Sequence, residues 1–174
     1  MNDELGVLIS PPAVAELGAY FKGTEFIDAV QVFRGVRMLS HRMNEASTDW
    51  LAPHNITVAQ YNFLAALFQH DRDVGLSSRD IGKYMHTTSG TVTSMTHTLE
   101  REGLVKRTEH STDRRSIMVK LTLKGRRRFV AAAGTHHARV VEALGRLSAG
   151  EIRSLIVLLT SVGNSLSAFL EPIA

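Results

Sequence analysis

The stretch LSSRDIGKYMHTTSGTVTSMTHTLEREGLVKRTE, residues 76–109, decides the fold of this chain. A short capped helix is predicted over residues 78–85, and the polar turn of residues 86–88 follows it. A second helix is predicted over residues 89–102. It ends at Gly103, because a residue without a Cβ suits the left-handed conformation that closes many helices. Two short helices around a tight turn predict a helix-turn-helix.

The first of these helices has its own cap and one unusual residue. Ser77 with Asp80 provides the side-chain cap at its start. Gly82 lies inside the helix, where glycine costs about 1 kcal/mol of helix propensity relative to alanine. We therefore expect a neighbouring helix to pack closely against this position.

A β-hairpin is predicted directly after the helix-turn-helix. Residues 104–109 read as a strand, residues 110–115 as a charged loop, and Ile117, Val119 and Leu121 as one face of a second strand with period-two alternation. A hairpin at this place is the wing of a winged helix-turn-helix.

The remaining chain is predicted to be helical. Capping boxes at Thr57 and Ser148 open two helices, and Thr122 is a plausible N-cap for a long helix between them. A further helix runs from Thr24 to a point between Asn44 and Thr48. Apolar residues recur along it at three- and four-residue intervals: Phe26, Ala29, Val30, Phe33, Val36, Leu39 and Met43.

The expected fold is therefore mainly α-helical with a small β-hairpin wing. Residues 1–23 form an N-terminal arm, and residues 56–122 form the winged helix-turn-helix. Residues 24–55 and 123–174 form a helical dimerisation region, because the apolar stripe of the last helix is too continuous for a protruding monomeric helix.

Composition and charge narrow the class of protein. The 174 residues include no cysteine, which excludes disulfides, thiolate metal sites and cysteine-based peroxide sensing. Residues 79–128 contain twelve Lys or Arg and five Asp or Glu, whereas the rest contains eight and twelve. This basic segment favours a nucleic-acid-binding protein. No apolar run reaches the roughly 18 residues needed to cross a bilayer, and the acidic start MNDELGVL is unlike a secretory signal, so we expect a cytoplasmic protein with no membrane partner.

The helix of residues 89–102 has two different faces. Val92, Met95 and Leu99 form a narrow apolar stripe, and the opposite face is polar and uncharged towards its N-terminus. After a capped helix and before a basic hairpin, this face predicts entry into a DNA major groove. Arg114 or Arg115, braced by Asp113, is placed to reach a narrow minor groove. The expected DNA-binding residues are Ser78, Thr87, Thr88, Ser89, Gly90, Thr91, Thr93, Ser94, His97, Arg101, Asp113, Arg114 and Arg115.

Residues 25–170 resemble the MarR family of bacterial and archaeal transcription regulators. The matching segments are ITVAQYNFLAAL at 56–67, LSSRDIGKYM at 76–85, TVTSMTHTLEREGLVKR at 91–107 and DRRSIMVKLTLKG at 113–125. The resemblance implies a triangular homodimer joined by the N-terminal and last two helices, and an Asp113–Arg115 pair that shapes the wing. Gly82 replaces the alanine commonly found in the family, which is a small-for-small change.

The resemblance also implies a function. We expect a sequence-specific regulator, usually a repressor relieved by a small molecule, that binds a pseudo-palindromic site in double-stranded DNA through two recognition helices about 34–36 Å apart. Family members often bind small aromatic or lipophilic anions between the dimer base and the DNA-binding lobe. Here such a cavity would be lined by Arg37, His41, Trp50, His54 and Tyr61, although Trp50 and Tyr61 are equally consistent with core positions.

Other functions have weaker support in the sequence. No recognisable nucleophile, acid–base pair or phosphate loop predicts an enzyme, and no cofactor is expected. His136 and His137 with His41 or His110 are conceivable metal ligands, but adjacent helical residues point about 100° apart, so a metal site is not expected. A non-specific architectural winged helix and a protein-binding winged helix remain as alternatives.

Overall fold

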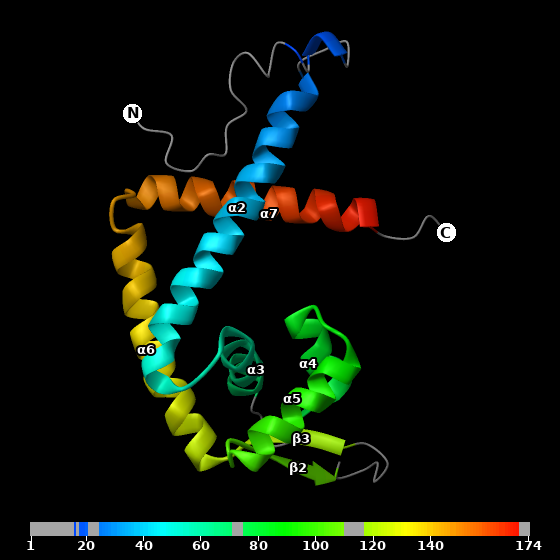
Figure 1. Ribbon diagram of the computed structural model, residues 1–174, viewed down its shortest axis with the longest axis vertical. Coiled ribbons are helices and arrows are strands. Elements are labelled where there is room, and N and C mark those ends of the chain that lie inside the picture. Colours follow the sequence, from blue (N-terminus) through cyan, green and yellow to red (C-terminus); the bar gives the residue numbers. More distant parts are fainter. Residues whose placement is uncertain (1–15, 17, 21–24, 71–74, 110–116, 171–174) are drawn as a thin grey trace. The chain divides into compact units, whose positions relative to one another are not determined.

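The computed structural model describes residues 16, 18–20, 25–70, 75–109 and 117–170. These residues form a mainly helical chain with one small sheet (Figure 1). Its elements are α2 (Glu25–Leu51), the short 3-10 helix η1 (Ala52–His54), α3 (Val58–Gln69), β1 (Leu76–Ser77), α4 (Ser78–Met85), α5 (Ser89–Arg101), β2 (Val105–Glu109), β3 (Ile117–Leu121), α6 (Leu123–Leu144) and α7 (Ala149–Leu170). The chain divides within α6 into two compact units, residues 1–133 and residues 134–174.

The first unit contains a lobe built on three short helices and the sheet. Helix α3 begins with the expected capping box, because Thr57 Oγ1 accepts the Gln60 N–H at 3.2 Å and the Thr57 N–H donates to Gln60 Oε1 at 3.0 Å. Helices α4 and α5 have the predicted bounds to within one residue. The helix-turn-helix and the paired strands after it are thus confirmed.

The core of this lobe joins its three helices, strands β2 and β3 and the start of α6. The fully buried side chains come from α3, α4, α5, β2, β3 and the first half of α6: Phe63, Leu64, Leu67, Ile81, Val92, Leu99, Val105, Val119 and Ala132. Phe129 of α6 packs between two rings of α3, with centroid distances of 5.4 Å to Tyr61 and 4.9 Å to Phe68. The first half of α6 is therefore part of the lobe core.

The sheet has a strand that the sequence did not predict. The two-residue β1 pairs antiparallel with β3, which makes β3 the central strand in the order β1-β3-β2. Both edges of β3 are consequently paired. The predicted alternation of buried and exposed residues along β3 is wrong at the first residue of the strand. Ile117, expected on the buried face, is 56% exposed, whereas Met118 is 8% exposed.

Helix α2 is longer than predicted. It continues through Thr48, whose hydroxyl donates to the Asn44 carbonyl at 2.8 Å, and ends at the buried Leu51 before Pro53 stops it. The predicted end of this helix between residues 44 and 48 was wrong. The polar residues of that segment do not interrupt the helix, because their side chains lie on its exposed surface. Its large apolar side chains Val32, Phe33, Val36, Leu39 and Met43 are exposed in the single chain.

The second unit contains the end of α6 and all of α7. The Ser148–Glu151 capping box is confirmed, because the Ser148 N–H donates to Glu151 Oε2 at 2.8 Å and the Glu151 N–H donates to Ser148 Oγ at 3.3 Å. Helix α7 has no buried residue, and Phe169 is 85% exposed. By length and composition alone α7 is apolar enough to span a membrane, but its uninterrupted apolar run is only residues 155–159.

Candidate nucleic-acid interface

The turn between α4 and α5 is held by hydrogen bonds on both sides. Ser77 Oγ accepts the Asp80 N–H at 3.2 Å and caps α4, while Thr88 Oγ1 accepts the Thr91 N–H at 3.3 Å and caps α5. Between them His86 adopts the left-handed conformation, with φ of 48°, which is uncommon for a residue other than glycine. The conformation of the turn is therefore stabilised by side chains at its own two ends.

Gly82 allows α4 and α5 to approach each other. The Thr87 N–H donates to the Gly82 carbonyl at 3.0 Å. A Cβ on Gly82 would lie 3.0 Å from the Thr87 carbonyl oxygen and 3.7 Å from Val92 Cγ2. The close packing expected at this glycine is thus present, against both the turn and α5.

Helix α5 presents a polar face to solvent. Its opposite face is buried through Val92, Thr96 and Leu99. Thr96 was not expected inside; it is 2% exposed, and its hydroxyl donates to the Val92 carbonyl at 2.8 Å, so burial leaves no unsatisfied donor. The outer residues are all exposed: Ser89, Gly90, Thr91, Thr93, Ser94, His97 and Arg101.

Two open hollows flank this face. One surrounds the turn and is lined by Ser78, Arg79, Lys83, His86, Thr87 and Ser89. The other joins the start of α3 to α5 and is lined by Thr57, Gln60, Thr91, Ser94 and Thr98. Arg79, Lys83 and Thr57 were not among the residues predicted from the sequence. Arg79 and Thr57 could have been found from their exposed positions at helix starts beside the predicted recognition surface, and Lys83 from its exposed position in the last turn of α4.

The end of α5 is tied to the elements that follow it. Glu100 binds Arg107 of β2, and Lys124 Nζ donates to the Glu102 carbonyl at 2.7 Å. Strands β2 and β3 pair from Val105↔Leu121 to Glu109↔Ile117. The wing tip, with Asp113, Arg114 and Arg115, lies outside the described residues.

Comparison with known proteins identifies the family of this chain. The model of the MarR family matches residues 56–117. The HTH-type transcriptional regulator YkoM of Bacillus subtilis is 35% identical over 143 residues, which span 82% of this chain and 91% of YkoM. The chain belongs to the MarR family.

Further relatives agree with this assignment. The HTH-type transcriptional repressor YetL of Bacillus subtilis is 26% identical over 145 residues, or 82% of this chain and 86% of YetL. The crystal structure of the MepR–DNA complex of Staphylococcus aureus matches with a TM-score of 0.68 and 29% identity over 75% of this chain and 93% of MepR. The predicted fold class is confirmed, and this MarR-family chain is a DNA-binding transcription regulator.

The five residues predicted to line a MarR-type ligand cavity lie in different environments. Arg37 and His41 are exposed on α2, where His41 Nε2 lies 3.4 Å from Glu45 Oε1. Trp50 is half-buried. Tyr61 is buried against Phe129, and this burial raises the pKa of its hydroxyl.

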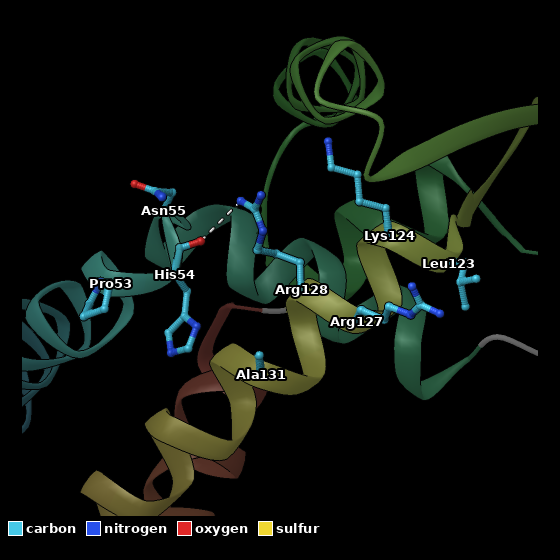
Figure 2. A pocket seen from close by; sticks show the side chains of 8 residues that line it. All are labelled: Pro53, His54, Asn55, Leu123, Lys124, Arg127, Arg128 and Ala131. Carbon is cyan, nitrogen blue, oxygen red and sulfur yellow. Dashed lines mark hydrogen bonds between the residues drawn. The ribbon is translucent and has the colours of Figure 1, made fainter.

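His54 instead faces a basic hollow at the start of α6. Pro53, His54 and Asn55 line one side of this hollow, and Lys124, Arg127 and Arg128 line the other (Figure 2). Arg128 Nη1 donates to the His54 carbonyl at 3.3 Å. We call it the α6 hollow.

His136 and His137 are adjacent on α6 and were considered as metal ligands. The His136 and His137 rings lie 6.1 Å apart at 68°. Burial, and secondly the charge of His137, lowers the pKa of His136. Across the described ranges, no three His, Cys, Asp or Glu side chains come together in a group able to hold a metal ion.

Proposed function

We propose that this MarR-family protein is a sequence-specific repressor that binds double-stranded DNA as a homodimer, with α5 as its recognition helix. The observation that carries the proposal is the two-sided character of α5. Val92, Thr96 and Leu99 anchor one face in the lobe core. The other face offers Ser94 and His97, whose side chains form no hydrogen bond with the described residues and are thus available to base edges.

The start of the recognition helix supports close approach to DNA. Gly90 is exposed, and a Cβ there would have only Thr88 Oγ1 nearby, at 3.8 Å. Position 90 is therefore open towards solvent, so the DNA backbone or a base edge has room to come close to the helix. Helix-turn-helix proteins place the first residues of this helix against base edges.

The basic and hydroxyl residues around the turn suit the phosphate backbone. Arg79 and Lys83 project from α4 beside the recognition helix, and Lys83 Nζ is only loosely paired with Asp80 Oδ1 at 3.7 Å. Thr87 and Thr88 add hydroxyl groups. Phosphate contacts of this kind fix the position of a protein on DNA, while base contacts supply sequence preference.

Dimerisation follows from the apolar surface that a single chain leaves exposed. On α7 this surface includes Ile156, Leu159 and Leu166, and on α2 it includes Phe33 and Met43. Exposed apolar helix faces of this kind are typical of surfaces that are covered in an obligate interface. A twofold dimer would present two copies of α5 to a pseudo-palindromic operator.

A small molecule is expected to relieve repression. In this part of the proposal an aromatic or lipophilic ligand binds near Arg37, His41, Trp50, His54 and Tyr61. The wing residues Asp113, Arg114 and Arg115 are proposed to contact the minor groove. The protein is expected to act in the cytoplasm and to catalyse no reaction.

Selection of bound duplexes from a random pool tests the proposal. A regulator should enrich one palindrome and prefer it to random duplex by about 10³-fold or more. Ser94→Ala and His97→Ala should relax the preference at particular bases, whereas Arg115→Ala should weaken binding to all sequences. Equal affinity for every duplex would favour the architectural alternative, and absence of DNA binding would favour a protein-binding winged helix.

A further inference from the structure

The outer face of α5 lacks the side chains that most often read bases. Residues 89–100 of this helix contain no Arg, Lys, Asn or Gln, and Arg101 stands at its last position. Arginine and lysine make the commonest specific contacts with guanine, while asparagine and glutamine pair with adenine through two hydrogen bonds. A recognition helix of this composition has to read its operator through smaller groups.

The hydroxyl group of Thr93 is engaged within α5. Thr93 Oγ1 donates to the Ser89 carbonyl, one turn earlier in the helix, at 2.9 Å. A threonine hydroxyl has a single hydrogen, so this bond uses the only donor of the side chain. Thr93 is nevertheless exposed. It therefore offers a neighbouring molecule its methyl group and an oxygen lone pair, but no hydrogen-bond donor.

Gly90 leaves the space beside Thr93 open. Helical side chains are tilted towards the N-terminus, so the side chain of Thr93 leans over the turn that contains Gly90. A Cβ at Gly90 would meet only Thr88 Oγ1 among the described side chains within 4 Å, at 3.8 Å. A flat base edge can therefore approach the Thr93 methyl group without meeting a side chain at position 90.

We propose that Thr93 reads a thymine in each operator half-site through contact between its methyl group and the C5 methyl group of the base. This inference rests on the proposed function and names a base that the recognition helix selects. In the major groove the C5 methyl group is found on thymine alone, and apolar contact with a threonine methyl is one of the ways in which proteins recognise it.

The engaged hydroxyl makes the DNA backbone a poorer partner for Thr93 than a base. Phosphate oxygens accept hydrogen bonds and therefore require a donor. The next residue, Ser94, is exposed, and its hydroxyl forms no hydrogen bond with the described residues, so it keeps its donor. Ser94 thus suits a hydrogen bond to DNA, whereas Thr93 suits an apolar contact.

Operators in which single thymines are replaced by deoxyuridine test the contact. Selection from a random duplex pool first gives the half-site, and each thymine in it is then replaced in turn. Uracil lacks only the C5 methyl group of thymine and keeps its hydrogen-bonding groups. For the wild-type protein, the replacement should lower affinity by about four-fold per half-site at one or more positions, as expected for one methyl group removed from an apolar contact.

Two substitutions separate the methyl group of Thr93 from its hydroxyl. Thr93→Ser removes the methyl group, so it should bind the thymine and uracil operators with equal affinity at one of these positions. Thr93→Val keeps a methyl group and loses the hydroxyl, so it should retain the preference for thymine. Thr48→Ser is the matched control and should also retain it. Thr48 is exposed on α2, where its hydroxyl makes the same kind of bond, to the Asn44 carbonyl at 2.8 Å.

The ratio of affinities compares two operators on the same protein, so a change in the stability of a variant does not alter it. A selected palindrome whose thymines all tolerate uracil would overturn the methyl contact and leave the proposed function in place. The same holds if every preference for thymine survives in Thr93→Ser, or if Thr93→Val loses the preference that Thr93→Ser loses. A protein that selects no palindrome would refute the proposed function and the thymine contact with it.

Discussion

The Glu100 carboxylate of α5 holds the start of the wing through Arg107 of β2. Its Oε1 accepts the Arg107 backbone N–H at 3.2 Å, and its Oε2 lies 3.5 Å from the Arg107 Nε. Both side chains are partly buried, so this contact is less screened than a surface ion pair. Helix α5 and strand β2 are thereby oriented with respect to each other.

Two substitutions at Glu100 separate the parts of this contact. Glu100→Ala should lower the free energy of unfolding by about 1–2 kcal/mol, because the Arg107 N–H and guanidinium both lose their acceptor. Glu100→Gln should cost roughly half as much, since the amide oxygen still accepts the N–H. Urea unfolding at low and high salt measures the free energy of unfolding of both variants. Equal losses of stability in the two variants would show that the charge of Glu100, and not the hydrogen bond from the Arg107 N–H, stabilises the contact.

Gly125 should tolerate no side chain. A Cβ at this position would lie 1.9 Å from the Leu104 carbonyl oxygen, so Gly125→Ala should destabilise the protein by about 3 kcal/mol or more. Gly134→Ala in the same helix is the control, because nothing lies within 4 Å of its Cβ. That variant should gain about 0.5–1 kcal/mol from helix propensity. Thermal unfolding distinguishes the two, and similar Tm values would contradict the close approach.

Arg79 and Lys83 should contribute to DNA affinity without sequence preference. Each phosphate contact releases counterions, so Arg79→Gln and Lys83→Gln should each reduce the slope of log K against log salt by about 1. Titrations of operator and random duplex over a range of salt concentrations measure the slope. Arg146→Gln should leave it unchanged. A changed base preference with an unchanged slope would place these residues at base edges instead.

The apolar surface of α7 should hold the dimer together. Ile156→Asp buries a charge in the proposed interface and should weaken dimerisation by about ten-fold or more. Ser161→Asp introduces the same charge about 140° away on the helical wheel and should have a smaller effect. Sedimentation equilibrium at several concentrations gives the dissociation constants. Equal constants for the two variants would mean that this face of α7 is not the interface.

Local signals predicted most of the helix-turn-helix from sequence. Thr57, Ser77 and Ser148 form the side-chain caps that their spacing indicates, and Gly103 has the expected positive φ of 70°. Caps and turns depend on neighbours three or four residues away, so their information is contained in a short segment.

Features that depend on tertiary pairing were not predictable in the same way. Strand β1 has two residues and exists only because β3 lies beside it. Thr96 is polar, but it can be buried because its hydroxyl donates a hydrogen bond to the Val92 carbonyl. The contact of Lys124 with Glu102 joins residues 22 positions apart. The assignment of individual DNA and ligand contacts remains a prediction.

Thr122 joins the end of one functional element to the beginning of another. Its Oγ1 lies 2.7 Å from the Gly103 carbonyl and accepts the Gly125 N–H at 2.9 Å, and its own N–H donates to the Leu104 carbonyl at 3.0 Å. Thr122 therefore connects the start of α6 directly to the two residues that close the C-terminal end of α5. The first turn of α6 is thereby held against the residues that follow α5, so these two helix ends are expected to shift together.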